Sequence, residues 1–163
     1  MLRHRFSLLP FAVLATLALV AAGCTAGASA SASASASASA LASAGATTVN
    51  VTLQEFSVIP ESATAPAGAI TFHVTNNGPA DIHEIVVFKT ELAPDALPTA
   101  EDGSVDETGE GVELIDEIED IPIGESQDLS VTLDAGSYVL ICNIVEGTEL
   151  HYAMGMRTAF TVE

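Results

Sequence analysis

The sequence has very little positive charge. Lys and Arg together number 4 among its 163 residues, against 22 Asp and Glu, and the formal net charge is −18 at pH 7. A nucleic acid or an anionic membrane surface is bound through basic side chains, so both are excluded as electrostatic partners. The charge permits a basic protein partner, metal cations or a salty habitat, and it equally serves as a solubilising surface.

Long apolar runs are also scarce. The apolar stretch of residues 11–20 follows a basic start with Arg3 and Arg5 and is too short to span a bilayer. Residues 1–23 therefore have the features of a secretory signal peptide. Its ending, Ala-Ala-Gly before Cys24, is similar to a bacterial lipoprotein cleavage site, which implies that Cys24 becomes a lipidated N-terminus. The alternative is plain secretion with a free Cys24.

Residues 24–46 contain almost nothing but Ala and Ser and cannot form a core, so they are expected to act as a flexible tether. Residues 47–163 have the length of one domain with a core of its own. The expected location is the outer face of a bacterial cytoplasmic membrane, reached by export and held there only through the lipid on Cys24.

The sequence contains only two cysteines, and with Cys24 assigned to lipid, Cys142 has no disulfide partner. A metal ligand is one good reason for an unpaired cysteine in an exported domain. His151 and Met156 follow Cys142 closely, and His83 lies far upstream. Thiolate, imidazole and thioether form a soft ligand set that favours copper. Each of these residues alone has a simpler role as core filler, but their order and strand context together favour copper.

The alternation of apolar and polar residues predicts short strands at roughly ten-residue spacing and little helix, which indicates a β-sandwich. The clearest predicted strands are Val49–Leu53, Ala69–Asn76, Ile82–Lys89, Asp128–Asp134, Ser137–Ile144 and Arg157–Glu163. The acidic segment Glu101–Asp120 fits a solvated loop, a short helix or an edge strand. It lacks the Asp-x-Asp-x-Asp-Gly pattern of a calcium-binding loop, so calcium is not favoured.

Three segments resemble the blue-copper, or cupredoxin, family of plastocyanin and azurin: NNGPADIHEIVVF, LDAGSYVLIC and HYAMGMRTAFTV. The resemblance covers the whole of residues 47–163. It implies an all-β, Greek-key β-sandwich of about seven or eight strands that holds one type 1 copper. Mapped residue by residue, the implied ligands are His83, Cys142, His151 and Met156.

Two methionines compete for the axial position of such a site. Met156 keeps the inward parity of the last strand and is favoured, and Met154 is then part of an apolar rim around an exposed histidine. His73 lies on the polar face of its strand and is expected at the surface. The sequence departs from the family in two places. Eight residues separate Cys142 from His151, a long loop for the family, and Glu84 follows His83 where plastocyanin-like sites often place Asn.

The resemblance implies a membrane-tethered one-electron carrier whose partners are redox proteins, and the acidic charge permits these partners a basic docking face. Two alternatives remain open, a copper binding or delivery protein without fast electron transfer and a metal-free surface interaction module. No nucleophile–base pair or phosphate-binding loop is visible, so an enzyme is not expected. The domain is expected to be a monomer.

Overall fold

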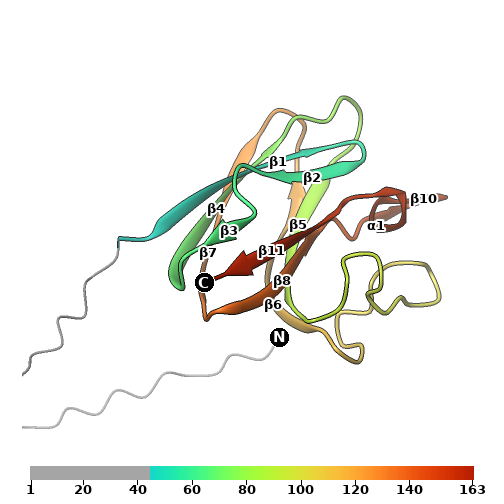
Figure 1. The fold of residues 1–163 in the computed structure, drawn as a ribbon. Coiled ribbons are helices and arrows are strands. Elements are labelled where there is room, and N and C mark those ends of the chain that lie inside the picture. The colour runs from blue at the N-terminus through green and yellow to red at the C-terminus, as the bar shows by residue number, and fades with distance from the viewer. Residues whose placement is uncertain (1–44) are drawn as a thin grey trace, which may run out of the picture. The chain divides into compact units, whose positions relative to one another are not determined.

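The computed structural model describes residues 45–163, and the predicted signal peptide, Cys24 and most of the tether lie outside the described residues. The described chain forms two main sheets (Figure 1). The first has the strand order β2(Ser57–Pro60), β1(Thr47–Gln54), β4(Gly68–Asn76), β7(Ser126–Leu133). The second has the order β3(Thr64–Ala65), β11(Arg157–Val162), β8(Gly136–Ile141), β5(His83–Lys89), β6(Glu113–Ile121). This is the predicted all-β sandwich.

Both sheets are mixed. Strands β1 and β4 pair in parallel, as do β11 and the short β3, whereas the other pairs within the two sheets are antiparallel. A small hairpin of β9(Val145–Glu146) and β10(Glu149–Leu150) precedes the short helix α1(His151–Met154). Within residues 45–163, no helix has the length and apolar character needed to cross a membrane.

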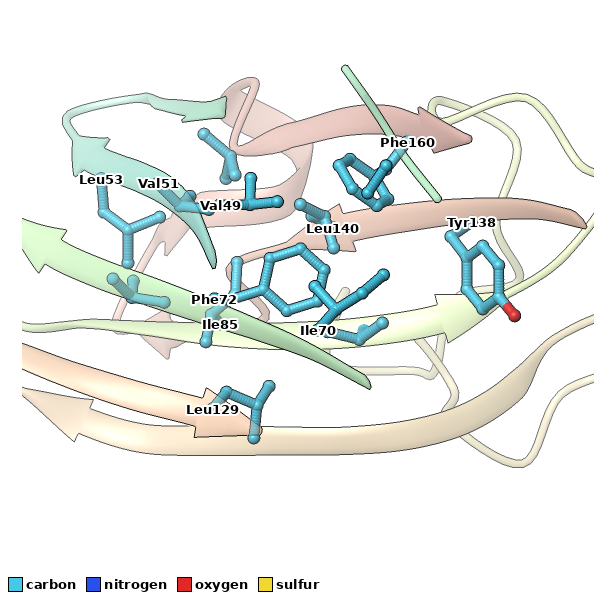
Figure 2. Close-up of a cluster of buried hydrophobic side chains, with 14 of the residues drawn as sticks. Val49, Val51, Leu53, Ile70, Phe72, Ile85, Leu129, Tyr138, Leu140 and Phe160 are labelled. Carbon is cyan, nitrogen blue, oxygen red and sulfur yellow. The ribbon is translucent and has the colours of Figure 1, made fainter. Parts of the chain in front are cut away.

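The main core lies between the two sheets, where every second side chain of the facing strands points inward (Figure 2). Strand β1 contributes Val49, Val51 and Leu53 and β4 contributes Ile70, Phe72 and Val74; the opposite sheet contributes Ile85, Leu140 and Phe160 among others. The rings of Phe72 and Phe160 meet edge to face across the core, with centroids 5.3 Å apart. This period-two burial is the pattern that predicted the strands.

Strands β5 and β8 are buried on both faces, because their outer side chains form a second apolar cluster under the segment 90–112. That cluster contains Val86, Phe88, Leu97, Val105, Val139, Ile141 and Tyr152. The near-continuous apolar run of β5 is thus explained by burial on both sides, as is typical of a central strand.

The structure also decides the points that sequence patterns left open. The acidic segment ends in an edge strand, β6, which pairs only with β5. Strand β8 ends at Ile141, so Cys142 begins a loop rather than continuing a strand to Ile144. Helix α1 was not predicted, because four residues are too few to show a helical period. His73 on β4 is partly exposed, and its Nδ1 lies 2.6 Å from Oδ1 of Asp128 on β7.

Candidate metal centre

His83 is the first residue of β5, at the end of the loop that follows β4. The buried side chain of Asn76 fixes this loop, since its amide donates hydrogen bonds to the carbonyl oxygens of Asp81 and Ile121, both at 2.9 Å. Its Oδ1 accepts the N–H of Gly78 at 2.8 Å. The segment that begins with Asn76 and Asn77 therefore holds His83 in the interior of the domain.

Cys142, His151 and Met156 come from the loop between β8 and β11. The N–H of Cys142 donates to the carbonyl of Met156, and the N–H of Met156 donates to the carbonyl of His151, both at 3.0 Å. The N–H of His151 donates to the carbonyl of Ile144 at 3.1 Å. These backbone hydrogen bonds close the loop and tie the three residues together. The long insertion noted in the sequence folds back on itself as the β9–β10 hairpin.

The structure brings His83, Cys142 and His151 together. Their three donor atoms form a triangle: the two Nδ1 atoms are 3.3 Å apart, and Cys142 Sγ lies 3.3 Å from His151 Nδ1 and 3.9 Å from His83 Nδ1. A point equidistant from these atoms lies about 2.0 Å from each, close to the ~2.0–2.1 Å of a metal–imidazole bond and a little under the ~2.3 Å of a zinc–thiolate bond. The group fits one metal ion without rearrangement.

The donors suit copper. Two imidazole nitrogens and one thiolate in a trigonal arrangement, with a weak axial thioether, are the ligand set of a blue-copper centre. Met156 is fully buried beside Cys142 in the main core, whereas Met154 is 47% exposed. Burial therefore favours Met156 over Met154 as the axial donor. From the sequence, the ligand histidine near Met154 was expected to be exposed. This expectation was wrong, because His151 is fully buried and the ring of Phe56 packs against it edge to face.

The metal-free site is electrostatically unfavourable. Burial raises the pKa of the Cys142 thiol to about 12. Burial, and next the neighbouring His151, lower the pKa of His83. The Nε2 atoms of both histidines are buried and make no hydrogen bond. A cation bound between these donors offsets the cost of burying them, because it favours the thiolate and the neutral imidazoles.

Glu84 connects the two chain segments that carry the ligands. Its N–H points at Cys142 Sγ at 3.5 Å, and its carboxylate accepts the N–H of Asn143 at 2.7 Å. Glu84, which stands where plastocyanin-like sites often have Asn, therefore connects strand β5 to the loop that begins at Cys142. Burial raises the pKa of Glu84 to about 7, although the Asn143 N–H opposes this shift.

Several supporting residues were missed in the sequence. The hydroxyl of Tyr152, next to His151, accepts the N–H of Leu97 at 3.1 Å and donates to the carbonyl of Pro94 at 2.9 Å, which anchors α1 to the segment 90–112. Asn143 donates to and accepts from the backbone of Val105. Nothing in the sequence pattern marks these contacts, because they join segments that lie far apart along the chain.

Glu55 was also missed. It lies in the turn between β1 and β2, and its Oε1 is 3.5 Å from His83 Nε2. Burial raises the pKa of Glu55, but the N–H groups that face the carboxylate outweigh this, so the pKa lies below its usual range. Nothing in the sequence around Glu55 indicates that its carboxylate lies close to His83.

A second group of side chains also has donor atoms within reach of one ion. It consists of Asp81, Glu149 and His151, of which Glu149 is exposed. Its imidazole and carboxylate donors suit Cu(II) better than Cu(I). It shares His151 with the buried triangle, so the two groups are alternative locations for a metal in the described domain.

Comparisons with solved structures find likenesses over most of the chain. The reduced auracyanin of the photosynthetic bacterium Roseiflexus castenholzii is 25% identical, and the alignment covers 73% of this chain and 99% of that one with a TM-score of 0.51. Auracyanin A of Chloroflexus aurantiacus, a "blue" copper protein, is 20% identical over 73% of this chain and 100% of that one, with a TM-score of 0.48. An azurin of Methylomonas sp. strain J is 16% identical over 73% and 99%, with a TM-score of 0.49. No family model and no curated protein matches the sequence.

Proposed function

We propose that this chain, a cupredoxin by its fold and its donor set, binds one copper ion through His83, Cys142, His151 and Met156 and carries single electrons between proteins. The observation that carries the proposal is the convergence of two Nδ1 atoms and one thiol sulfur within 3.9 Å of one another. When bound there, copper supplies the one-electron change between Cu(II) and Cu(I). The protein loses and gains nothing else, so one electron taken from a donor is passed to an acceptor.

The protein's own residues prepare the site for this chemistry. The side chains of the four donors are fully buried, which excludes water from the bonding positions. The Glu84 N–H directed at the sulfur stabilises the thiolate and tunes the potential. The backbone hydrogen bonds among Cys142, Met156 and His151 hold the donors in place in both oxidation states. A site whose geometry is fixed by the protein changes little when the electron arrives, which favours rapid exchange.

A partner would dock near the loops that carry the ligands. Ile82 and Met154, which lie close in sequence to His83 and His151, are large apolar side chains exposed to solvent. A surface pocket of about 380 Å³ is lined by Ala80, Asp81, Ile82, Ile144, Val145 and Glu146, from the His83 loop and the β9 hairpin. Apolar contacts beside carboxylates favour a partner with a basic face. His151 is fully buried, so an electron would reach it through the side chains that cover it, among them Phe56.

The same proposal places the domain outside the cell. The apolar N-terminal segment, the Ala-Ala-Gly-Cys ending and the Ala/Ser tether support export and lipidation at Cys24. A monomeric domain on a tether reaches partners in the membrane while it remains soluble itself. The donor set leaves no protein nucleophile or base beside a substrate site, which supports a carrier rather than an enzyme.

A copper delivery function is the second candidate, and the Asp81–Glu149–His151 group is the observation that favours it. Carboxylates next to a shared histidine provide a second location from which a cation is passed on.

The experiment is a copper titration of the protein followed by visible spectroscopy and voltammetry. A carrier shows an intense thiolate-to-copper band at one equivalent and a reversible wave. Tight copper binding with neither signal supports delivery, and no stoichiometric binding leaves a metal-free interaction module. Replacing Cys142→Ser abolishes the band, and a band that survives this change rejects the proposed ligand set.

A further inference from the structure

The side chain of Glu55 lies near Nε2 of the His83 ring, whereas Cys142 lies near Nδ1. Its Oε1 is 3.5 Å from His83 Nε2, and its side chain is only 11% exposed while His83 is fully buried. The other carboxylate oxygen, Oε2, is buried without a hydrogen-bond partner, and so is His83 Nε2. Two groups that face each other at this distance with so little exposure are unlike a surface ion pair, because solvent screens their interaction only weakly.

The orientation of the His83 ring decides which atom carries its proton. Nδ1 faces Cys142 Sγ at 3.9 Å and His151 Nδ1 at 3.3 Å. A neutral imidazole that offers Nδ1 to a metal has its proton on Nε2. That proton lies on the side of the ring where Glu55 Oε1 is 3.5 Å from Nε2.

The carboxylate is held in place by the loop that also carries His83. Its Oε1 accepts the N–H of Asp81 at 2.7 Å and the N–H of Ala80 at 3.2 Å. A side chain at Gly78 would meet Oε1, since an added Cβ would lie 2.7 Å from it. Glu55 therefore connects the β1–β2 turn to the loop before His83, and these hydrogen bonds restrain its carboxylate relative to His83.

We propose that Glu55 is a positioning residue that accepts the Nε2–H of His83 and lowers the reduction potential of the copper bound at Nδ1. This inference rests on the proposed function, because it concerns the same copper site. A carboxylate behind a ligand histidine fixes the ring and its tautomer and makes the ligand more basic. Its negative charge, little screened in the interior, stabilises Cu(II) more than Cu(I).

The test is Glu55→Gln in the full-length chain, purified in detergent and loaded with copper. Gln keeps the shape and an acceptor oxygen but removes the charge. The blue band remains, while Cu(II) affinity relative to Cu(I) falls at least tenfold, which raises the potential by about 59 mV for a one-electron couple. The matched control is Glu146→Gln, an exposed carboxylate on the Cys142–His151 loop whose removal shifts the potential much less.

A second measurement needs no metal. In the metal-free protein, NMR of the imidazole assigns His83 to the Nε2–H tautomer, with its proton shifted downfield by the carboxylate; Glu55→Gln moves this resonance upfield. An unchanged potential together with an unchanged resonance overturns the inference. So does a potential shift in Glu146→Gln as large as that in Glu55→Gln. If the wild-type protein shows no blue band, the proposed function fails, and the resonance alone then decides whether Glu55 holds the His83 proton.

Discussion

The Nδ1 atoms of His83 and His151 lie 3.3 Å apart inside the domain, although the two residues are 68 positions apart along the chain. One comes from the start of a central strand and the other from a short helix in the last loop. Both rings are fully buried and meet edge to face, with centroids 5.1 Å apart. Two imidazoles whose donor nitrogens meet in the interior, with a thiol beside them, form a group that could hold a metal ion.

Copper is expected to stabilise the fold. The ion binds donors from two distant segments that unfolding separates, so it binds the native state in preference. One site adds about 2.7 kcal/mol to the free energy of unfolding at a free metal concentration of 100 times Kd. Urea unfolding with and without copper measures the difference. His83→Ala should lose the stabilisation, and equal stability of the wild-type protein in both conditions would contradict the site.

Met156→Leu and Met154→Leu separate the two axial candidates. Met156 is fully buried, and a Leu of similar volume costs the fold less than about 1.5 kcal/mol. Loss of the thioether removes a donor from Cu(II), so the potential rises and the spectrum changes. Met154→Leu, at an exposed position, leaves both unchanged. The reverse result would assign the axial position to Met154.

Glu84→Ala is expected to destabilise the domain by about 1–3 kcal/mol, because the Asn143 N–H loses its acceptor. Glu84→Gln is the matched control: it keeps an acceptor oxygen and removes a charge that burial disfavours, so it retains the wild-type stability or exceeds it at pH 8. Urea unfolding of the metal-free proteins gives both values. Equal losses for Ala and Gln would mean that the charge, not the hydrogen bond, holds the loop.

Glu117 should add to the stability of the metal-free domain as the pH is lowered, against the loss expected from His83, whose pKa is lowered. Burial, and next the carboxylates of Glu107, Glu119 and Asp116, raise the pKa of Glu117. A carboxyl whose pKa is higher folded than unfolded takes up its proton first in the folded state, so lowering the pH through the folded pKa favours folding. Thermal unfolding of the wild-type protein and of Glu117→Gln at several pH values checks this, because the variant lacks only the contribution of Glu117. An identical pH dependence in the two proteins would contradict this assignment.

Much of the fold was predictable because it rests on local patterns. The alternation of Ile70, Phe72 and Val74 with polar neighbours predicts a half-buried strand, and the nearly continuous apolar run of β5 predicts a central one. The candidate donors were also predictable, since Cys142, His151 and Met156 share one short segment. That they bind copper remains a prediction.

The surroundings of the donors were not predictable, for a physical reason. Glu55, Glu84 and Tyr152 act through contacts with backbone or side chains that lie 25, 59 and 55 or more residues away. Such contacts depend on how the sheets pack, and the spacing of residues along the sequence does not predict them. The burial of His151 was missed for the same reason, because the side chains that cover it come from other parts of the chain, among them Phe56.

The most direct measurement is a crystal structure of the copper-loaded protein with anomalous scattering data collected at the copper edge. We expect one anomalous peak in the described domain, between His83 Nδ1, His151 Nδ1 and Cys142 Sγ, with Met156 on the axis. A peak among Asp81, Glu149 and His151, with Cys142 unbound, would contradict the blue-copper assignment. So would the absence of any copper peak in a protein loaded with one equivalent.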